Sequence, residues 1–95
     1  MVSKIPKTRE EVFNQLDSML NKSEREVFVK ADPIVYHFSL GLWIRNNWIY
    51  EQDEEDVKRL AKVFRLDPHF FEADDLSSKI LESYKRHLKK LSKNY

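Results

Sequence analysis

A histidine and an arginine interrupt the most apolar stretch of the chain. Between Pro33 and Ile49, the residues His37, Gly41 and Arg45 recur at intervals of four, so on a helix they form one line along an otherwise apolar face. An arginine on such a face needs an acceptor, because an unpaired buried charge costs several kcal/mol. The glycine predicts a close approach, since Gly inside a helix costs roughly 0.5–1 kcal/mol relative to Ala.

Two interpretations of this line are open. In the structural one, Arg45 ties its helix to an aspartate that caps the last helix, and a backbone carbonyl satisfies His37. In the functional one, the guanidinium fork binds the carboxylate or phosphate of a small ligand. The residues of this predicted polar network or ligand site are His37, Arg45, Asn46, Asp74, Asp75, Tyr84 and Arg86.

Other catalytic and metal-binding patterns are missing from the sequence. There are no cysteines, and the three histidines (His37, His69 and His87) do not form the His-Glu-x-x-His pair of a zinc site. One glycine cannot build a glycine-rich phosphate loop, and no serine lies in the Gly-x-Ser-x-Gly pattern of hydrolases. We therefore predict no catalytic residue, no metal and no cofactor. General acid–base catalysis by His37 alone is the enzymatic alternative.

Two oppositely charged segments are candidates for contact with a partner. Five of the six residues from 51 to 56 are acidic, and five of the nine from 85 to 93 are lysine or arginine. Acidic residues in the first turn of a helix and basic residues in its last turn complement the helix dipole, which would explain both segments. The alternative explanation is a patch that docks a partner. The predicted protein interface adds a tryptophan and an amide to the acids: Trp43, Asn47, Glu51, Asp53, Glu54 and Glu55.

Apolar residues at helical spacing predict that helices position all of these side chains. Capping boxes at Thr8–Glu11 and Ser23–Glu26 indicate two helix starts, and Asp32-Pro33 indicates a third. The predicted helices cover about 9–21, 23–31, 33–49, 54–65 and from Asp74 or Asp75 to about 91, with a single turn after Asp67-Pro68. The helix over 33–49 has little polar surface, so we expect it to be central and largely buried. Because no alternating pattern predicts a strand, the fold class is all-α, a compact bundle of four main helices with one or two short ones.

The length and composition indicate one folded domain. Of the 95 residues, 41% are hydrophobic and 13% aromatic, which is typical of a globule. We expect a flexible lead-in over 1–7, a single helical domain over 8–91 and a short tail over 92–95. No apolar run reaches the ~18–20 residues of a membrane span, and the first seven residues lack the apolar core of a signal peptide. A cytoplasmic protein without membrane contact is expected.

The central and last predicted helices carry a distinctive pair of motifs. Tyr36–Trp48 reads Y-H-F-S-L-G-L-W-I-R-N-N-W, and Asp74–Leu88 reads D-D-L-S-S-K-I-L-E-S-Y-K-R-H-L. Together they resemble the signature of a family of small bacterial domains of unknown function, and Leu16–Leu20 resembles its first helix. The acidic segment over 51–56 departs from that family, so any role of these acids is particular to this protein. The resemblance implies a compact helical domain of bacterial or phage source, and it implies no activity.

The leading functional hypothesis is a non-enzymatic interaction domain that binds another protein. A toxin-neutralising (immunity-like) partner, a phage-encoded inhibitor and an accessory subunit would all act in this way. The alternative is a domain for a small anionic ligand, or a minor enzyme, with its site at His37 and Arg45. Nucleic-acid binding through the basic last helix is the third, and the net charge of +1 gives it a weak electrostatic footprint. A monomer or a homodimer is expected.

Overall fold

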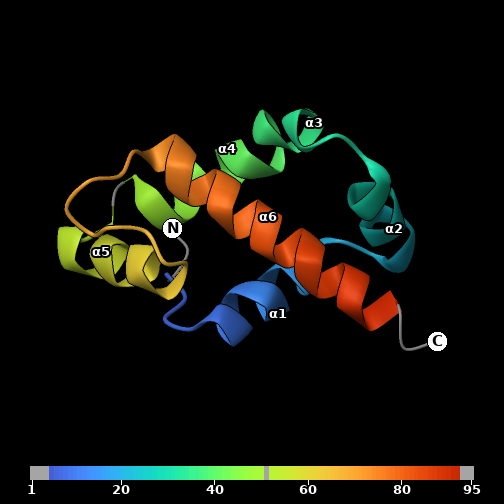
Figure 1. Cartoon of the computed structure of the whole chain (residues 1–95), viewed down its shortest axis with the longest axis horizontal. Helices are drawn as coiled ribbons and strands as arrows, with labels where there is room; N and C mark the ends of the chain where they lie inside the picture. The colour runs from blue at the N-terminus through green and yellow to red at the C-terminus, as the bar shows by residue number, and fades with distance from the viewer. Residues whose placement is uncertain (1–4, 51, 93–95) are drawn as a thin grey trace.

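One long helix, α6 (Ala73–Ser92), crosses much of the molecule, and most of the other helices pack along it (Figure 1). The computed structural model describes residues 5–50 and 52–92, and within these ranges all regular secondary structure is helical. The other elements are α1 (Arg9–Met19), α2 (Lys22–Lys30), α3 (Pro33–His37), α4 (Leu40–Ile44), the π-helix η1 (Arg45–Ile49) and α5 (Glu54–Val63). The all-α prediction is confirmed for the described residues, and residues 1–4, 51 and 93–95 lie outside them.

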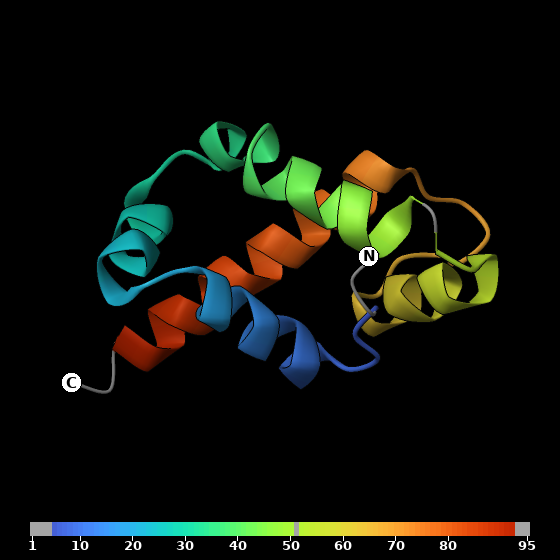
Figure 2. The ribbon, with the colours of Figure 1, turned by 180° about the vertical axis from the view of Figure 1, so that it is seen from behind.

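Helix α6 occupies the central place that the sequence assigns to residues 33–49. It contacts α2, α3, α4 and η1, and Figure 2 shows α1 on one side of it and the α3–α4–η1 segment on the other. Its apolar residues recur at helical spacing, and Leu76, Ile80 and Tyr84 are fully buried. At the centre of the core, the Tyr84 ring packs against Phe13 of α1 (5.7 Å between centroids) and Phe28 of α2 (5.6 Å).

The prediction of one continuous, largely buried helix over 33–49 is wrong. Helix α3 starts at Pro33 as predicted, with the Asp32 side chain accepting from the backbone N–H of Ile34 (3.1 Å). The helix then breaks at Ser39, whose φ and ψ of −108° and −82° are not helical, and α4 and η1 follow. The break lets Tyr36 pack edge-on against Phe28 (4.8 Å between centroids) while α4 packs on α6. None of the α3 residues is buried, so α3 forms surface.

One of the first two helix starts also differs in detail from the sequence patterns. The Thr8 hydroxyl caps α1 by accepting from Glu11 N–H (3.1 Å), as expected. Helix α2 begins earlier than expected, because Asn21 and Glu24 form the reciprocal capping box in place of Ser23 and Glu26. Asparagine is at least as good as serine at this position, so the earlier start is the one realised.

The core extends beyond the predicted domain boundary. Ile5, in the expected lead-in over 1–7, is buried against the helices, in one cluster with Trp48, Phe64 and Tyr84. The radius of gyration is 13.0 Å, close to the value of about 13 Å for a compact domain of 100 residues. The described residues include no helix that is long and apolar enough to cross a membrane.

Candidate functional site

Arg45 is buried at the start of η1, where three different groups surround its guanidinium. Nη1 donates to the hydroxyl of Ser77 (2.9 Å), and Nη2 donates to the backbone carbonyl of His37 (3.1 Å). Nε lies 3.3 Å from Oδ1 of Asp74. The residue is 6% exposed, so these contacts replace water almost completely. Arg45 thus joins η1 to the end of α3 and to the first turn of α6.

Gly41 leaves the space through which the Arg45 side chain passes. A Cβ atom at this position would lie 3.2 Å from Nη1 of Arg45 and 3.3 Å from the carbonyl oxygen of Tyr36. The close approach that the glycine predicts is therefore made by a side chain and a backbone segment of the chain itself. All three guanidinium nitrogens therefore contact acceptors of the chain itself.

The remaining residues of the predicted polar site do not converge on Arg45. Asn46 is exposed on η1. Asp75 accepts from the backbone N–H of Glu72 (3.0 Å), and Arg86 pairs with Glu82 on the exposed side of α6 (3.2 Å). The imidazole of His37 is half-buried and packs edge-on against Phe38 (4.9 Å between centroids).

Tyr84 forms a separate polar contact near the middle of α6. Its hydroxyl donates to Oδ1 of Asp17 on α1 (2.6 Å). Burial, the hydrogen bond to Asp17 and the charge of that carboxylate raise the pKa of Tyr84 well above its ordinary value of 10.0. The phenol therefore stays neutral and holds α1 to α6.

The two interface candidates from η1 and α4 turn inward. Trp43 is half-buried and packs edge-on against the fully buried Trp48 (5.2 Å between centroids). The amide of Asn47 donates to the backbone carbonyl of Trp43 (2.8 Å). Both side chains are thus used in internal packing.

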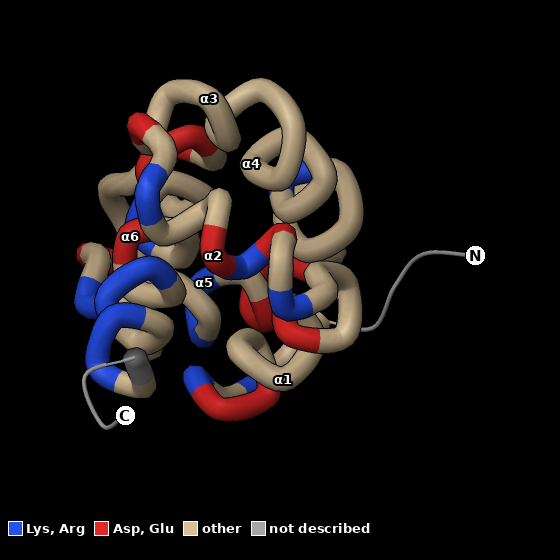
Figure 3. Tube along the Cα trace, turned by 90° about the vertical axis from the view of Figure 1, so that its right-hand side faces the viewer, with Lys and Arg blue, Asp and Glu red and all other residues tan. Residues whose placement is uncertain are grey.

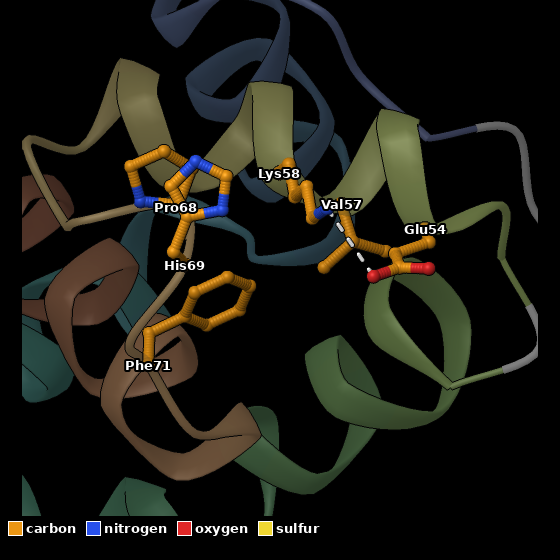
Figure 4. Close-up of a pocket in the computed structure, with 6 residues that line it drawn as sticks. All are labelled: Glu54, Val57, Lys58, Pro68, His69 and Phe71. Carbon is orange, nitrogen blue, oxygen red and sulfur yellow. Dashed lines mark ion pairs between the residues drawn. The ribbon is translucent and has the colours of Figure 1, made fainter.

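The acidic interface candidates lie at the start of α5. Asp53 is the exposed N-cap residue, and Glu54 and Glu55 lie 3.2 and 3.8 Å from Nζ of Lys58. Glu51 falls outside the described residues. Figure 4 shows Glu54 and Lys58 at one side of a shallow pocket of about 330 Å³, with Pro68, His69 and Phe71 across from them. The described residues contain no group of three or more His, Cys, Asp or Glu that could hold a metal ion.

A second pocket, of about 250 Å³, lies between α2, α3 and α6. Its lining is mostly apolar with a polar edge: Phe28, Ala31, Pro33, Tyr36, His37, Ser78, Leu81, Glu82 and Lys85. Helix α3 forms one wall through Pro33, Tyr36 and His37. Lys85 is fixed at the edge because its ammonium donates to the backbone carbonyl of Ala31 (2.7 Å).

The two residues of α3 that do not line this pocket, and the residue that follows the helix, are exposed and apolar. The exposed fractions of Ile34, Val35 and Phe38 are 63%, 59% and 71%. We call these three residues, with the adjoining pocket, the α3 surface. Helical periodicity assigns all three side chains to a largely buried helix, so this surface was not predicted. A signal was present, since no Asp, Glu, Lys or Arg occurs from residue 33 to 44 in a chain that is 35% charged. Figure 3 shows this stretch as an uncharged part of the tube.

Comparison with known proteins gives one match. The family model described as "Domain of unknown function (DUF6794)" matches residues 5–88, which is most of the chain. No curated protein and no solved structure matches the chain. The matched range begins at the buried Ile5 and spans the Arg45 network, the α3 surface and most of α6.

Proposed function

Because the chain belongs to this family of domains of unknown function, whose description carries no activity, we propose a function from the geometry alone: the domain binds another protein through the α3 surface and catalyses no reaction. The observation that carries the proposal is the exposure of three apolar side chains, Ile34, Val35 and Phe38, on and next to the helix whose other residues line an apolar pocket.

The exposure of these side chains is costly in water. Burying apolar area contributes about 25 cal/mol per Å², so covering three large aliphatic and aromatic side chains would strongly favour association. The centres of protein interfaces are depleted of charged residues, and residues 33–44 share this composition in an otherwise charged chain. Three large apolar side chains exposed within five residues are more than the single scattered ones that ordinary surfaces carry, and such groups mark protein-binding sites.

The adjoining pocket supports recognition of one particular side chain. Its floor is apolar through Phe28, Tyr36 and Leu81, while Glu82 and Lys85 lie at its edge. Apolar anchors that enter such pockets dominate the energy of many interfaces. The expected partner therefore presents an aliphatic or aromatic side chain, surrounded by apolar surface that covers Ile34 and Phe38.

The internal use of Arg45 favours this proposal over an anion site at His37 and Arg45. Arg45 is 6% exposed, and each of its three guanidinium nitrogens contacts an acceptor of the protein, so an anion would have to compete with those acceptors at a buried position. Toxin neutralisation, inhibition of a host enzyme by a phage protein and an accessory-subunit role are all forms of the proposed activity. They differ only in the identity of the partner that covers the α3 surface.

Site-specific photocrosslinking tests the proposal. A benzophenone amino acid replaces Phe38 in one variant and Phe70 in a matched control, because Phe70 is also exposed (83%) but lies after α5. Both variants are expressed in cells of the source organism, and the protein crosslinked through position 38 is purified and titrated by calorimetry. We expect binding that Phe38→Ser weakens at least about tenfold and Phe70→Ser leaves unchanged.

Three outcomes would overturn the proposal. The first is a crosslinked protein that reacts equally through position 70. The second is an affinity for the purified protein that Phe38→Ser does not change. The third is a crosslink at position 38 that joins two copies of this chain, which would make the α3 surface a homodimer interface.

A further inference from the structure

A groove lies between α2 and the C-terminal part of α6, away from the α3 surface. Its volume is about 550 Å³, and it is lined by Lys22, Arg25, Glu26, Val29, Lys30, Leu88 and Leu91, a set we call the α2/α6 groove. The apolar residues form its floor: Leu88 is buried, Val29 is half-buried and Leu91 is 48% exposed. A large aliphatic side chain that is half exposed in a groove is ready to be covered by another apolar group.

The edge of the α2/α6 groove is basic. The charged residues that line it are three bases, Lys22, Arg25 and Lys30, and one acid, Glu26. Lys89 and Lys90 are exposed on the turn of α6 that carries Leu88 and Leu91, and Figure 3 shows the Lys and Arg colour gathered at this end of α6. Among the described residues, no ion pair within 4.0 Å involves Lys22, Lys30, Lys89 or Lys90.

Arg25 gives this edge a fixed position. Its Nη1 donates to the backbone carbonyls of Asp17 (3.1 Å) and Leu20 at the end of α1. Lys30, Lys89 and Lys90 complement the negative ends of α2 and α6, whereas Lys22 lies at the start of α2, where the dipole does not favour a cation. The helix dipole does not explain why Leu91 is exposed beside these lysines. A ligand that is both acidic and apolar would contact the lysines and Leu91 together.

We propose that the α2/α6 groove binds an acidic amphipathic helix of a partner protein. The apolar face of the helix would cover Val29, Leu88 and Leu91, and its carboxylates would face the lysines at the edge. Docking of an amphipathic helix into an apolar groove is a recurring mode of peptide recognition. Nucleic acid fits less well, because phosphates would use the lysines and leave the leucines exposed. This proposal concerns a surface that shares no residue with the α3 surface, so each can fail without the other.

A designed peptide is the probe for this test. The fluorescein-labelled peptide carries leucines at positions i, i+3, i+4 and i+7 and glutamates elsewhere. One control peptide has lysines in place of the glutamates, and a second has the same composition in scrambled order. By fluorescence anisotropy, we expect the acidic peptide to bind at least about tenfold more tightly than either control. Binding should weaken as salt rises from about 0.1 to about 1 M, because the Debye length falls from about 10 to about 3 Å.

Variants assign the binding to the groove. Lys22→Glu/Lys30→Glu and Leu91→Ser change exposed side chains that line the groove, so both proteins are expected to fold, as circular dichroism will show. Each should weaken the acidic peptide at least about tenfold, and the charge reversal should improve binding of the basic peptide. Phe38→Ser is the matched control and should bind the acidic peptide as the unaltered chain does.

The same titrations contain the results that would overturn the proposal. Equal binding of the acidic and scrambled peptides, or no effect of the charge reversal, would remove it. Tighter binding to a duplex DNA oligonucleotide, lost in Lys22→Glu/Lys30→Glu, would assign the basic edge to nucleic acid. Tighter binding to phosphatidylcholine vesicles containing phosphatidylserine, lost in Leu91→Ser, would assign the groove to an anionic membrane surface.

Discussion

Arg45 and Asp74 form an ion pair whose two side chains differ sharply in exposure. Nε of Arg45 lies 3.3 Å from Oδ1 of Asp74, and the exposed fractions of the two side chains are 7% and 61%. The pair therefore lies at the boundary of the core, with the cation inside and the anion at the surface. Water screens the carboxylate, so the hydrogen bonds of Arg45 to Ser77 and His37 carry more of the energy of this network than the ion pair does.

Arg45→Met should destabilise the fold by about 2–4 kcal/mol, because it removes two charge-assisted hydrogen bonds and leaves the His37 carbonyl without its donor. Asp74→Asn should cost less than about 1 kcal/mol, since an exposed ion pair contributes little. Urea unfolding followed by circular dichroism measures both. Equal losses in the two variants would show that the ion pair dominates, and a neutral Arg45→Met would show that the network has no structural role.

Gly41→Ala should destabilise the protein by about 1–3 kcal/mol, although alanine is the better helix former. The added methyl group would lie 3.2 Å from Arg45 Nη1 and 3.3 Å from the Tyr36 carbonyl, and the backbone at Tyr36 cannot easily retreat. A double-mutant cycle with Arg45→Met checks the cause by urea unfolding. If Arg45 is the obstacle, the cost of the alanine should fall when Met replaces the arginine, and strict additivity would place the obstacle at Tyr36.

Tyr84→Phe should lower the free energy of unfolding at pH 7 by about 0.5–1.5 kcal/mol through loss of the hydrogen bond to Asp17. Because the folded state raises the pKa of Tyr84, the folded state binds this proton more tightly than the unfolded state does. The resulting stability is fully present below the ordinary value of 10.0 and declines as pH rises above it.

Urea unfolding of both proteins between pH 7 and pH 11 checks the pH dependence. Above pH 10, the unaltered chain should lose stability relative to Tyr84→Phe by up to about 1.4 kcal/mol per pH unit. Other groups titrate equally in the two proteins, so the difference isolates Tyr84. A difference that stays constant through pH 11 would contradict a raised pKa.

Ile34→Ser and Val35→Ser should each change stability by no more than about 0.5 kcal/mol, because both side chains are mostly exposed. Ile44→Ala is the matched control in α4, where the side chain is fully buried, and should cost about 2–5 kcal/mol. Thermal unfolding of the three variants checks this contrast. A loss above about 2 kcal/mol for Ile34→Ser would mean that α3 is buried in solution, as a continuous central helix requires.

Most helix positions could be predicted from the sequence, since local signals specify them. Thr8 and Asp32 cap helices as expected because a cap needs only a side-chain oxygen and nearby N–H groups. The apolar residues of α6 follow the helical period over about four turns, so that helix could also be predicted. The sequence could not show that Asn21 caps α2 in place of Ser23, because each of the two residues is a good N-cap with a glutamate three positions later.

The candidate site was less predictable than the fold. That Arg45 needs a buried acceptor follows from the residue types alone, and Asp74 was among the residues named for it. Asn46 and Arg86 were named with it but point to solvent. Helical spacing tells which residues share a face, but it does not tell which neighbour covers that face.

By itself, the sequence determined an all-α chain, the starts of most helices and an arginine that had to be paired inside. Only the tertiary structure decided that α6 is the central helix and that the predicted helix over 33–49 is interrupted at Ser39. It also decided that Ile34, Val35 and Phe38 stay exposed. Capping and periodicity are local properties that a few neighbouring residues specify. Whether an apolar helix face is buried depends on which other helices cover it, and that is settled only when the helices pack. In this fold α2 and α6 cover one side of α3, and its other side stays exposed.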